Sequence, residues 1–449
     1  FPGHRASLTV LRGVSTITPM LRLPACLRLA LPLVLAWLVL PTPGASAEDE
    51  LASASRIEAA PVRGTLTGLD AEAVTLEGPG GKAVRIPLAE LQAVEFPTGT
   101  EKRAPAPWRV TLMCGAELMG DLESPDGDGL GVELAHSKAK VRLPYEAIRH
   151  VERLPRAAGQ CARPALRHGP EKSKDIVWRS KSKDRISGTL ADADGRGVVL
   201  EDERERERRV AWGDVLVLHL DNDPVAAAEG VQVEIEHANG SRLTAAAPPR
   251  LVGTNLQFAL RSHPTAQLSL PLSEIASIRA SGGRFVYASD LSFESTYTPF
   301  HEPPADAPWV KAMVTKLMGP RADQRADGCP LRLAGRVHRK GLYAHAHSVI
   351  KLPLEGSYSS FQCLFGILDD DPGAQMPNRT PEKADVVARV VADGKTLWEE
   401  KGVTLARGAL RVGPLDVKGV KVLELHVEFG RNQDVCDDAV WVNPVLVRK

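Results

Sequence analysis

A pattern that recurs four times fills the middle of the chain and limits its fold more than any other feature. In three copies a Gly-x-Leu segment starts the pattern, at Gly64, Gly120 and Gly188. A proline, or a glycine in the third copy, follows 23, 24 and 25 residues later. In these copies, and in a looser fourth copy that runs through Val231–Ile278, two apolar residues stand four and seven places beyond that position. Such shared spacing indicates an internal repeat of one small structural unit.

The polarity pattern within each copy predicts strands. Apolar and polar residues alternate in runs of four to six that Gly, Asp-Gly or Pro interrupts, which is typical of short, half-buried antiparallel strands. The final apolar pair predicts a 3₁₀ turn that leads into a closing strand. About five strands in about 50 residues suit a small barrel, whose closure removes exposed edges. The pattern is similar in architecture to SH3-like or Sm-like barrel repeats, which we place at residues 56–97, 108–155, 175–221 and 230–281.

Charge and composition limit the functions that the repeats can have. The sequence holds 56 basic and 56 acidic residues, so no net field attracts nucleic acid. Glu201–Arg209 alternates in charge, which favours a solvated hairpin. No chemically active residue recurs at one place in the copies, and we expect them to act as spacers or protein-docking modules. Linkers are expected at Pro97–Pro107, Ala157–Lys174 and Asn222–Glu229.

The N-terminal segment has the order of a secretion signal. After Met20, the natural start, come two arginines, the apolar run Leu29–Leu40 and an Ala-x-Ala sequence that ends at Ala47. We expect residues 1–47 to hold an upstream extension and a Sec-type signal peptide that is cleaved after Ala47. The apolar run is too short to span ~30 Å of hydrocarbon, although a membrane anchor is the alternative. The mature protein is therefore expected to be secreted or periplasmic, without a membrane span.

The composition of the sequence changes near residue 284, where aromatic residues and clusters of aspartate appear. Val386–Val391 is apolar at most positions, and Asp393-Gly394 predicts a tight hairpin turn into the next strand. Helical periodicity is limited to Val310–Leu317. Residues 284–449 therefore predict an antiparallel, jelly-roll-like β-sandwich, and the whole chain is expected to be all-β.

Five motifs occur in order in this last segment. They are Ser289-Asp-Leu, Lys340-Gly-Leu-x-x-His-Ala, Phe361-x-x-x-x-Gly-Ile-x-Asp-Asp, Val390-x-x-Asp-Gly-Lys and Asp438-x-x-Trp-x-x-Pro. Together they resemble the NPCBM domain, the novel putative carbohydrate-binding module, which is related to family 51 carbohydrate-binding modules. Tyr297–Asp327 is longer and richer in proline than the family pattern. The resemblance implies a non-catalytic module that binds polysaccharide or glycoconjugate.

Sugar recognition generally uses an aromatic face that stacks on a pyranose ring, together with polar groups that bind its hydroxyls. Tyr343, His345, Trp441 and Asp370 are the candidates for these roles. His345 matches the histidine of the family motif, and a structural histidine under a loop is the alternative. Trp441 stands in the closing motif, where a buried core position is the alternative.

Two acidic turns make a candidate metal site. Asp369, Asp370 and Asp371 form one turn, and Asp437 and Asp438 form the other. If the turns face each other they can hold Ca²⁺, which takes six to eight oxygen ligands, and sandwich modules of this type often carry a structural calcium. Solvated turn aspartates are the alternative. Exposed consecutive aspartates are poor candidates for a glycosidase pair, which needs one raised pKa in a cleft.

Cysteine usage allows one disulfide. Five cysteines follow the signal segment, an odd and sparse set. Cys363 with Cys436 is the candidate bridge because both lie in motif-bearing segments, and buried free thiols are the alternative. The sequence as a whole favours an exported glycan-binding accessory or adhesive protein that is not an enzyme. The alternatives are a protein–protein scaffold without sugar binding and, less favoured, a glycoside hydrolase.

Overall fold

The computed structural model describes most of the chain after residue 50. The described residues are 51–57, 59–97, 106–155, 165, 168–223, 225–226, 229–302, 306–325, 328–369 and 380–449. Nearly all regular structure in these ranges is β-strand, so the predicted all-β fold class is confirmed. The segment 1–47, with the predicted signal peptide, lies outside them. In the described part of the chain, no helix is long and apolar enough to cross a membrane.

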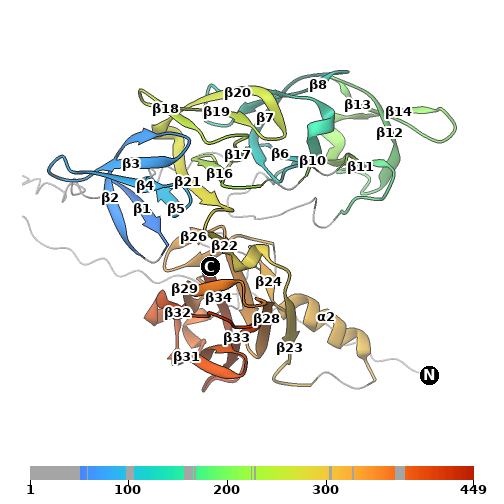
Figure 1. The fold of residues 1–449 in the computed structure, drawn as a ribbon. Coiled ribbons are helices and arrows are strands. Elements are labelled where there is room, and N and C mark those ends of the chain that lie inside the picture. Colours follow the sequence, from blue (N-terminus) through green and yellow to red (C-terminus); the bar gives the residue numbers. More distant parts are fainter. Residues whose placement is uncertain are drawn as a thin grey trace, which may run out of the picture. The chain divides into compact units, whose positions relative to one another are not determined.

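Four successive groups of strands, which correspond to the four copies, form the first part of the fold (Figure 1). The first three have a short strand, a long strand, two further short strands and a closing strand, whereas the fourth has six strands, two of them only three residues long. A 3₁₀ turn precedes the closing strand in repeats two to four, as predicted. The elements are β1(Ala52–Arg56), β2(Ala59–Leu69), β3(Ala73–Glu77), β4(Ala83–Pro87) and β5(Leu91–Glu95); β6(Trp108–Leu112), β7(Glu117–Asp126), β8(Gly129–Leu134), β9(Lys140–Leu143), η1(Tyr145–Ala147) and β10(Ile148–Arg153); β11(Asp175–Arg179), β12(Arg185–Asp194), β13(Gly197–Glu201), β14(Glu207–Ala211), η2(Trp212–Asp214) and β15(Val215–His219); and β16(Gln232–His237), β17(Arg242–Thr244), β18(Arg250–Val252), β19(Asn255–Leu260), β20(His263–Pro271), η3(Leu272–Glu274) and β21(Ile275–Ser281).

The recurring glycine lies where the long second strand changes partner. In β2, Gly64 pairs with β1, while the next residue pairs with β3. A Cβ on Gly64 would lie 2.5 Å from the carbonyl oxygen of Glu77. At Gly120 and Gly188, a Cβ would lie 2.0 and 2.2 Å from a carbonyl oxygen of the facing strand. Backbone crowding at the change of partner therefore requires glycine in these three copies.

The repeats do not close into separate barrels. Among the described residues of the first repeat, β4 pairs with β3 and β5 pairs with β1, but β4 and β5 do not pair. Strand β5 instead pairs with β21 of the fourth repeat, and β10 of the second pairs with β15 of the third. The prediction of closed barrels is therefore wrong in this respect, because the edges of one repeat are covered by another.

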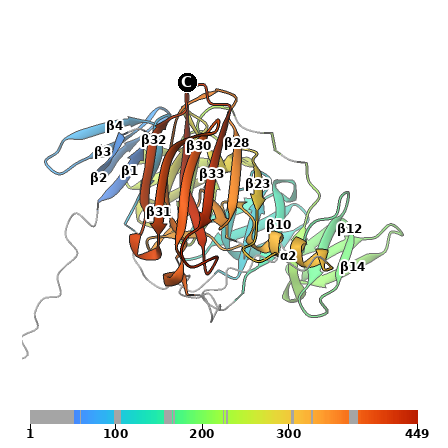
Figure 2. The same ribbon diagram turned by 90° about the horizontal axis from the view of Figure 1, so that it is seen from below.

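The C-terminal segment forms two antiparallel sheets, which confirms the predicted sandwich (Figures 1 and 2). One sheet has the order β24-β27-β34-β29-β32, with β22 paired to β34, and the other has the order β23-β28-β33-β30-β31. Figure 2 shows strands of the second sheet side by side. The elements are β22(Phe285–Tyr287), η4(Ala288–Asp290), β23(Glu294–Tyr297), α2(Pro308–Met318), β24(Arg321–Ala322), β25(Leu331–Leu333), β26(Arg336–His338), β27(Gly341–His345), β28(Ser348–Pro353), β29(Tyr358–Ile367), η5(Pro381–Lys383), β30(Val386–Ala392), β31(Lys395–Val403), η6(Leu405–Arg407), β32(Leu410–Asp416), β33(Val422–Phe429) and β34(Asp438–Arg448).

The structure contains the helix and the hairpin turn that the sequence predicts in this segment. The predicted helix is α2, and the predicted turn joins β30 to β31, with positive φ at both Asp393 and Gly394. Between the sheets, the Trp441 ring packs on Phe365 and Trp398, with centroids 4.3 and 6.1 Å away. Helix α2, in contrast, buries none of its residues.

The cysteines do not pair as predicted. Cys363 lies buried in the sandwich core and Cys436 is half-buried before β34, and both are free thiols. The Cys436 sulfur instead accepts a hydrogen bond from the Thr380 amide at 3.3 Å. The predicted bridge is therefore wrong, and the alternative of a buried free thiol is confirmed for Cys363. Cys329 is disulfide-bonded.

Candidate functional site

Two neighbouring strands of the first sheet hold four of the residues that the sequence singled out. Strand β27 carries Tyr343 and His345, and β34 carries Asp438 and Trp441. His345 pairs with Asp438 across the strands, and the Tyr343 hydroxyl donates a hydrogen bond to the Asp438 carboxylate. Motifs almost 100 residues apart therefore meet in one part of the sheet.

The predicted sugar-contacting rings are nevertheless buried. Tyr343, His345 and Trp441 are 2%, 5% and 0% exposed, because every position of β27 is covered and the Trp441 ring lies between the sheets. Direct contact between a sugar and these three side chains does not fit the structure. Trp441 is the core residue that was the alternative. His345 is likewise structural, with Nδ1 2.8 Å from the Ala346 carbonyl oxygen. Asp370 lies outside the described residues.

A pocket of about 240 Å³ lies beside these buried residues. The Tyr297 ring, which forms one wall, meets the His345 ring edge-on with centroids 6.0 Å apart. Arg321, on another wall, pairs with Tyr343 in the β24–β27 ladder. His345 and Tyr343 therefore support the walls of the pocket from behind. Strand β23, the end of α2 and the start of β24 supply the lining, which consists of Ser295, Tyr297, Thr315, Lys316, Gly319, Pro320 and Arg321.

The charged side chains that line this pocket are cations. Lys316 and Arg321 are its ionisable cations, and no acidic residue is among the described residues that line it. Neither cation forms an ion pair with a described residue. One Arg321 amino group donates to the Lys316 carbonyl oxygen, and the Arg321 Nε is buried without an acceptor.

Tyr297 gives the pocket an aromatic surface with a neutral hydroxyl. The side chain is half-buried, and this burial raises the pKa of Tyr297 to about 12, with the charges of Asp434 and Asp438 adding to the effect. The phenol therefore stays protonated at neutral pH. Together with the hydroxyls of Ser295 and Thr315, it provides the mixture of ring surface and polar groups that ligand pockets use to orient a polar ligand.

Two described carboxylates of the acidic turns, those of Asp369 and Asp438, have different partners. Asp369 accepts a hydrogen bond from the Gly335 amide between β25 and β26, whereas Asp438 accepts one from Tyr343. Within the described ranges, no group of three or more His, Cys, Asp or Glu side chains is placed to hold a metal. Asp370 and Asp371 lie outside those ranges.

Asp437 is a buried carboxyl group next to a second one. It is 0% exposed, and its Oδ1 accepts a hydrogen bond from the Asp385 amide at 3.0 Å. Its Oδ2 and the Oδ1 of Asp385 are both buried without a partner. Burial raises the pKa of Asp437 to about 7, and the neighbouring charges of Asp434, Asp385 and Asp438 act in the same direction. These two oxygens suit either a proton or a hard cation.

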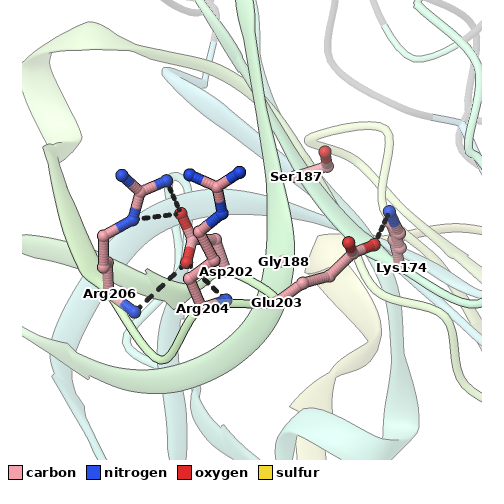
Figure 3. A pocket seen from close by; sticks show the side chains of 7 residues that line it. All are labelled: Lys174, Ser187, Gly188, Asp202, Glu203, Arg204 and Arg206. Carbon is pink, nitrogen blue, oxygen red and sulfur yellow. Dashed lines mark hydrogen bonds and ion pairs between the residues drawn. The ribbon is translucent and has the colours of Figure 1, made fainter.

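A second pocket, of about 360 Å³, lies at the turn between β13 and β14 (Figure 3). Asp202 accepts two hydrogen bonds from the Arg206 guanidinium, and Glu203 pairs with Lys174 at 2.7 Å. These four charged side chains neutralise each other, as expected for the solvated hairpin predicted at Glu201–Arg209, and Arg204 also lines the pocket. The pocket in the sandwich has an aromatic wall and two cations that form no ion pair with a described residue, and it is therefore the candidate that we consider for a ligand site.

The C-terminal sandwich is the part of the chain that a family model matches. Residues 302–447 match the family model of the NPCBM/NEW2 domain, so this segment carries a domain of that family, as the five motifs predicted. The match covers the C-terminal third of the chain. No curated protein matches the sequence.

Solved structures of carbohydrate-binding modules are among the matches, at low overall similarity. A family 51 module of a family 95 glycoside hydrolase from Clostridium perfringens, in complex with methyl-galactose, is 19% identical, with 36% of this chain and 99% of that chain covered and a TM-score of 0.27. A second family 51 module with its neighbouring domains from ZmpB of the same organism, in complex with GlcNAc, is 19% identical, with 48% and 40% covered and a TM-score of 0.29. Tandem family 51 modules of a family 98 glycoside hydrolase from Streptococcus pneumoniae are 14% identical, with 76% and 100% covered and a TM-score of 0.28.

The predicted residues Tyr343 and His345 lie behind the pocket, and none of the residues that line it was predicted. Ser295 and Tyr297 lie between the first and second family motifs, and the remaining lining residues lie in Tyr297–Asp327, the segment that departs from the family pattern. The sequence held one indication of the pocket: this long insertion contains the predicted helix and the two cations Lys316 and Arg321. The family motifs could not reveal this segment because they contain only residues that family members share.

Proposed function

We propose that the C-terminal sandwich binds carbohydrate and that the pocket beside Tyr297 is its binding site. The observation that carries this proposal is the pocket lining, which combines a half-buried aromatic ring, two hydroxyl side chains and two cations that form no ion pair with a described residue. A ring of this kind stacks on the apolar face of a pyranose, while donors on the opposite wall bind its hydroxyls. The NPCBM/NEW2 match in the same segment is consistent with this role.

The proposed function extends to the whole chain as an exported, non-catalytic accessory or adhesive protein. The motif segment supports a binding role, and Asp438, the described half of the suggested hydrolase pair, is already engaged by Tyr343. The repeats would then position the sandwich or dock other extracytoplasmic proteins. Hydrolase activity that disappears in Asp438→Asn, in a chain that still folds, would contradict the non-catalytic role.

Replacing Tyr297 by alanine is expected to weaken glycan binding at least about tenfold, because the stacking surface is lost. Binding of the full chain to an array of immobilised galactose-terminated, N-acetylglucosamine-terminated and acidic glycans measures this. Trp309→Ala is the matched control, since Trp309 is an aromatic residue of the same domain that is 67% exposed and lies outside the pocket lining. Equal loss in both variants, or full binding by Tyr297→Ala, would place the site elsewhere.

We also propose a structural calcium ion at the buried pair Asp437 and Asp385. The support is chemical: Asp437 accepts a hydrogen bond from the Asp385 amide, each of the two carboxylates has a buried oxygen with no hydrogen-bond partner among the described residues, and hard cations take oxygen ligands. Asp369 and Asp438, which the sequence also suggested, are engaged by Gly335 and Tyr343. The ion would offset the repulsion between the buried carboxylates.

Calcium at a concentration about 100-fold above its dissociation constant is expected to raise the melting temperature of the EDTA-treated chain by about 5–10 °C. Asp437→Asn should lose most of this shift, whereas Asp369→Asn should keep it because that carboxylate is held by the Gly335 amide. Differential scanning calorimetry with calcium, magnesium and no metal measures the effect. An unchanged melting temperature on adding calcium would exclude the ion from this pair.

A further inference from the structure

We infer that the pocket beside Tyr297 selects sugars that carry a carboxylate, such as uronic or sialic acids, over their neutral counterparts. This inference rests on the proposed sugar-binding function and adds the class of ligand. The family match gives no preference of this kind, because the residues that carry the argument lie in the insertion that departs from the family pattern.

The first support is uncompensated charge. Two positive side chains, Lys316 and Arg321, line a pocket of about 240 Å³ to which the described residues contribute no carboxylate. Two other cations on strands of the same sandwich are paired: Arg389 contacts Glu399 and Glu428, and Lys351 contacts Glu424 at 2.9 Å. Two cations left without such partners in one concave site favour an anionic ligand.

The second support is the fixed position of the guanidinium. Arg321 lies in the short strand β24, in register with Tyr343, and one of its amino groups donates to the Lys316 carbonyl oxygen at the end of α2. That bond holds the side chain in place and leaves the other amino group, Nη1, without a described partner. A planar, positioned guanidinium suits a planar carboxylate, and little side-chain entropy remains to be lost on binding.

The third support is the combination of groups around the charge. Ser295 and Thr315 present hydroxyls, and Tyr297 presents a ring with a protonated hydroxyl, on the walls that accompany the two cations. A simple inorganic anion has no use for the aromatic wall, whereas a sugar acid uses both. The volume is below the range of about 300–1,000 Å³ that is usual for drug-sized ligands, so one sugar ring is the scale of ligand expected.

The test compares sugars that differ only in the carboxylate. Titration calorimetry of the full chain with galacturonic acid oligosaccharides and their methyl esters forms one arm, and sialylated lactose with lactose forms the other. In at least one arm, binding of the acid is expected to be about tenfold tighter than that of its neutral counterpart, which corresponds to about 1.4 kcal/mol. The arm that shows the preference identifies the source of the carboxylate. The preference should shrink as NaCl rises, because salt screens exposed charges.

Two variants and a control locate the preference. Lys316→Gln and Arg321→Gln should each bring acid and neutral sugar to nearly equal affinity while weaker sugar binding remains. Lys311→Gln removes the same charge from α2 at an exposed residue outside the lining and should keep the preference. Because Arg321 is half-buried, its variant is compared by melting temperature first; exposed Lys316 gives an independent answer if the Arg321 variant unfolds.

The outcomes separate the inference from the proposed function. Equal binding of acid and neutral sugars by the wild-type chain would overturn the inference while sugar binding stands. Absence of binding to every sugar in both arms would overturn the proposed function and the inference with it. A preference that survives in both Lys316→Gln and Arg321→Gln would show that a different site selects the carboxylate.

Discussion

Replacing Trp441 by alanine is expected to lower the free energy of unfolding by about 3–5 kcal/mol, the range typical of a fully buried aromatic residue. The ring is 0% exposed and packs on Phe365 and Trp398 at centroid distances of 4.3 and 6.1 Å. Alanine would leave a cavity between the two sheets that the rigid strands cannot close. Urea unfolding of the full chain, followed by the fluorescence of the remaining tryptophans, measures the change.

The same variant separates a core role from a binding role for Trp441. Trp309→Ala, which truncates a tryptophan that is 67% exposed, should change stability by no more than about 0.5 kcal/mol. Trp441→Phe should recover part of the loss, because it refills most of the cavity. Unchanged stability with lost glycan binding in Trp441→Ala would mean that the ring contacts the sugar and that its burial between the sheets is incorrect.

Asp437→Asn is expected to remove a loss of stability that the wild-type chain suffers as pH rises from 5 to 8 in calcium-free buffer. The pKa of Asp437 is about 7 in the folded chain and near its ordinary value of 3.8 in the unfolded chain. Between these values the folded state holds a proton that the unfolded state has released, so stability falls as pH rises. The full effect is on the order of a few kcal/mol at pH 8.

Asparagine suits this test because it keeps an oxygen that can accept the hydrogen bond from the Asp385 amide. Melting curves of the wild type and the variant are compared at each pH, so that other groups cancel. Burial lowers the pKa of His219 and of His338, which makes stability rise with pH over the acidic part of this window in both chains. Asp369→Asn is the control, and parallel wild-type and Asp437→Asn curves would show that Asp437 is ionised without cost.

The fold class, the spacing of the repeats and the hairpin turn of the sandwich could be predicted because each depends on residues that are close together in the sequence. The glycine spacing predicted the copies, and Gly64 turned out to sit where a Cβ would lie 2.5 Å from a carbonyl oxygen. Asp393-Gly394 predicted its hairpin because that turn requires positive φ at both residues. In these cases the physical cause lies within a few residues of the signal.

Features that depend on distant partners were predicted less well. Cys363 and Cys436 both lie near motifs, but pairing requires their side chains to meet, and one faces the core while the other accepts a bond from Thr380. The candidate rings of Tyr343 and Trp441 were placed in the right part of the domain, and their burial followed from a second covering layer that no local pattern reveals. The pocket itself draws on β23, α2 and β24, whose meeting depends on the whole sandwich.

The repeats pair with one another through their edge strands, and this pairing affects how the middle of the chain can fold. Strand β5 is completed by β21, and the contact between Glu95 and Arg279 joins residues 184 positions apart. During synthesis β5, which pairs with β1 in its own repeat, must therefore wait for the fourth repeat before its second edge has a partner. A truncation after the third repeat would leave an unpaired edge that invites association with another chain. For the same reason we expect the segment to resist extension under tension more than a string of independent domains would.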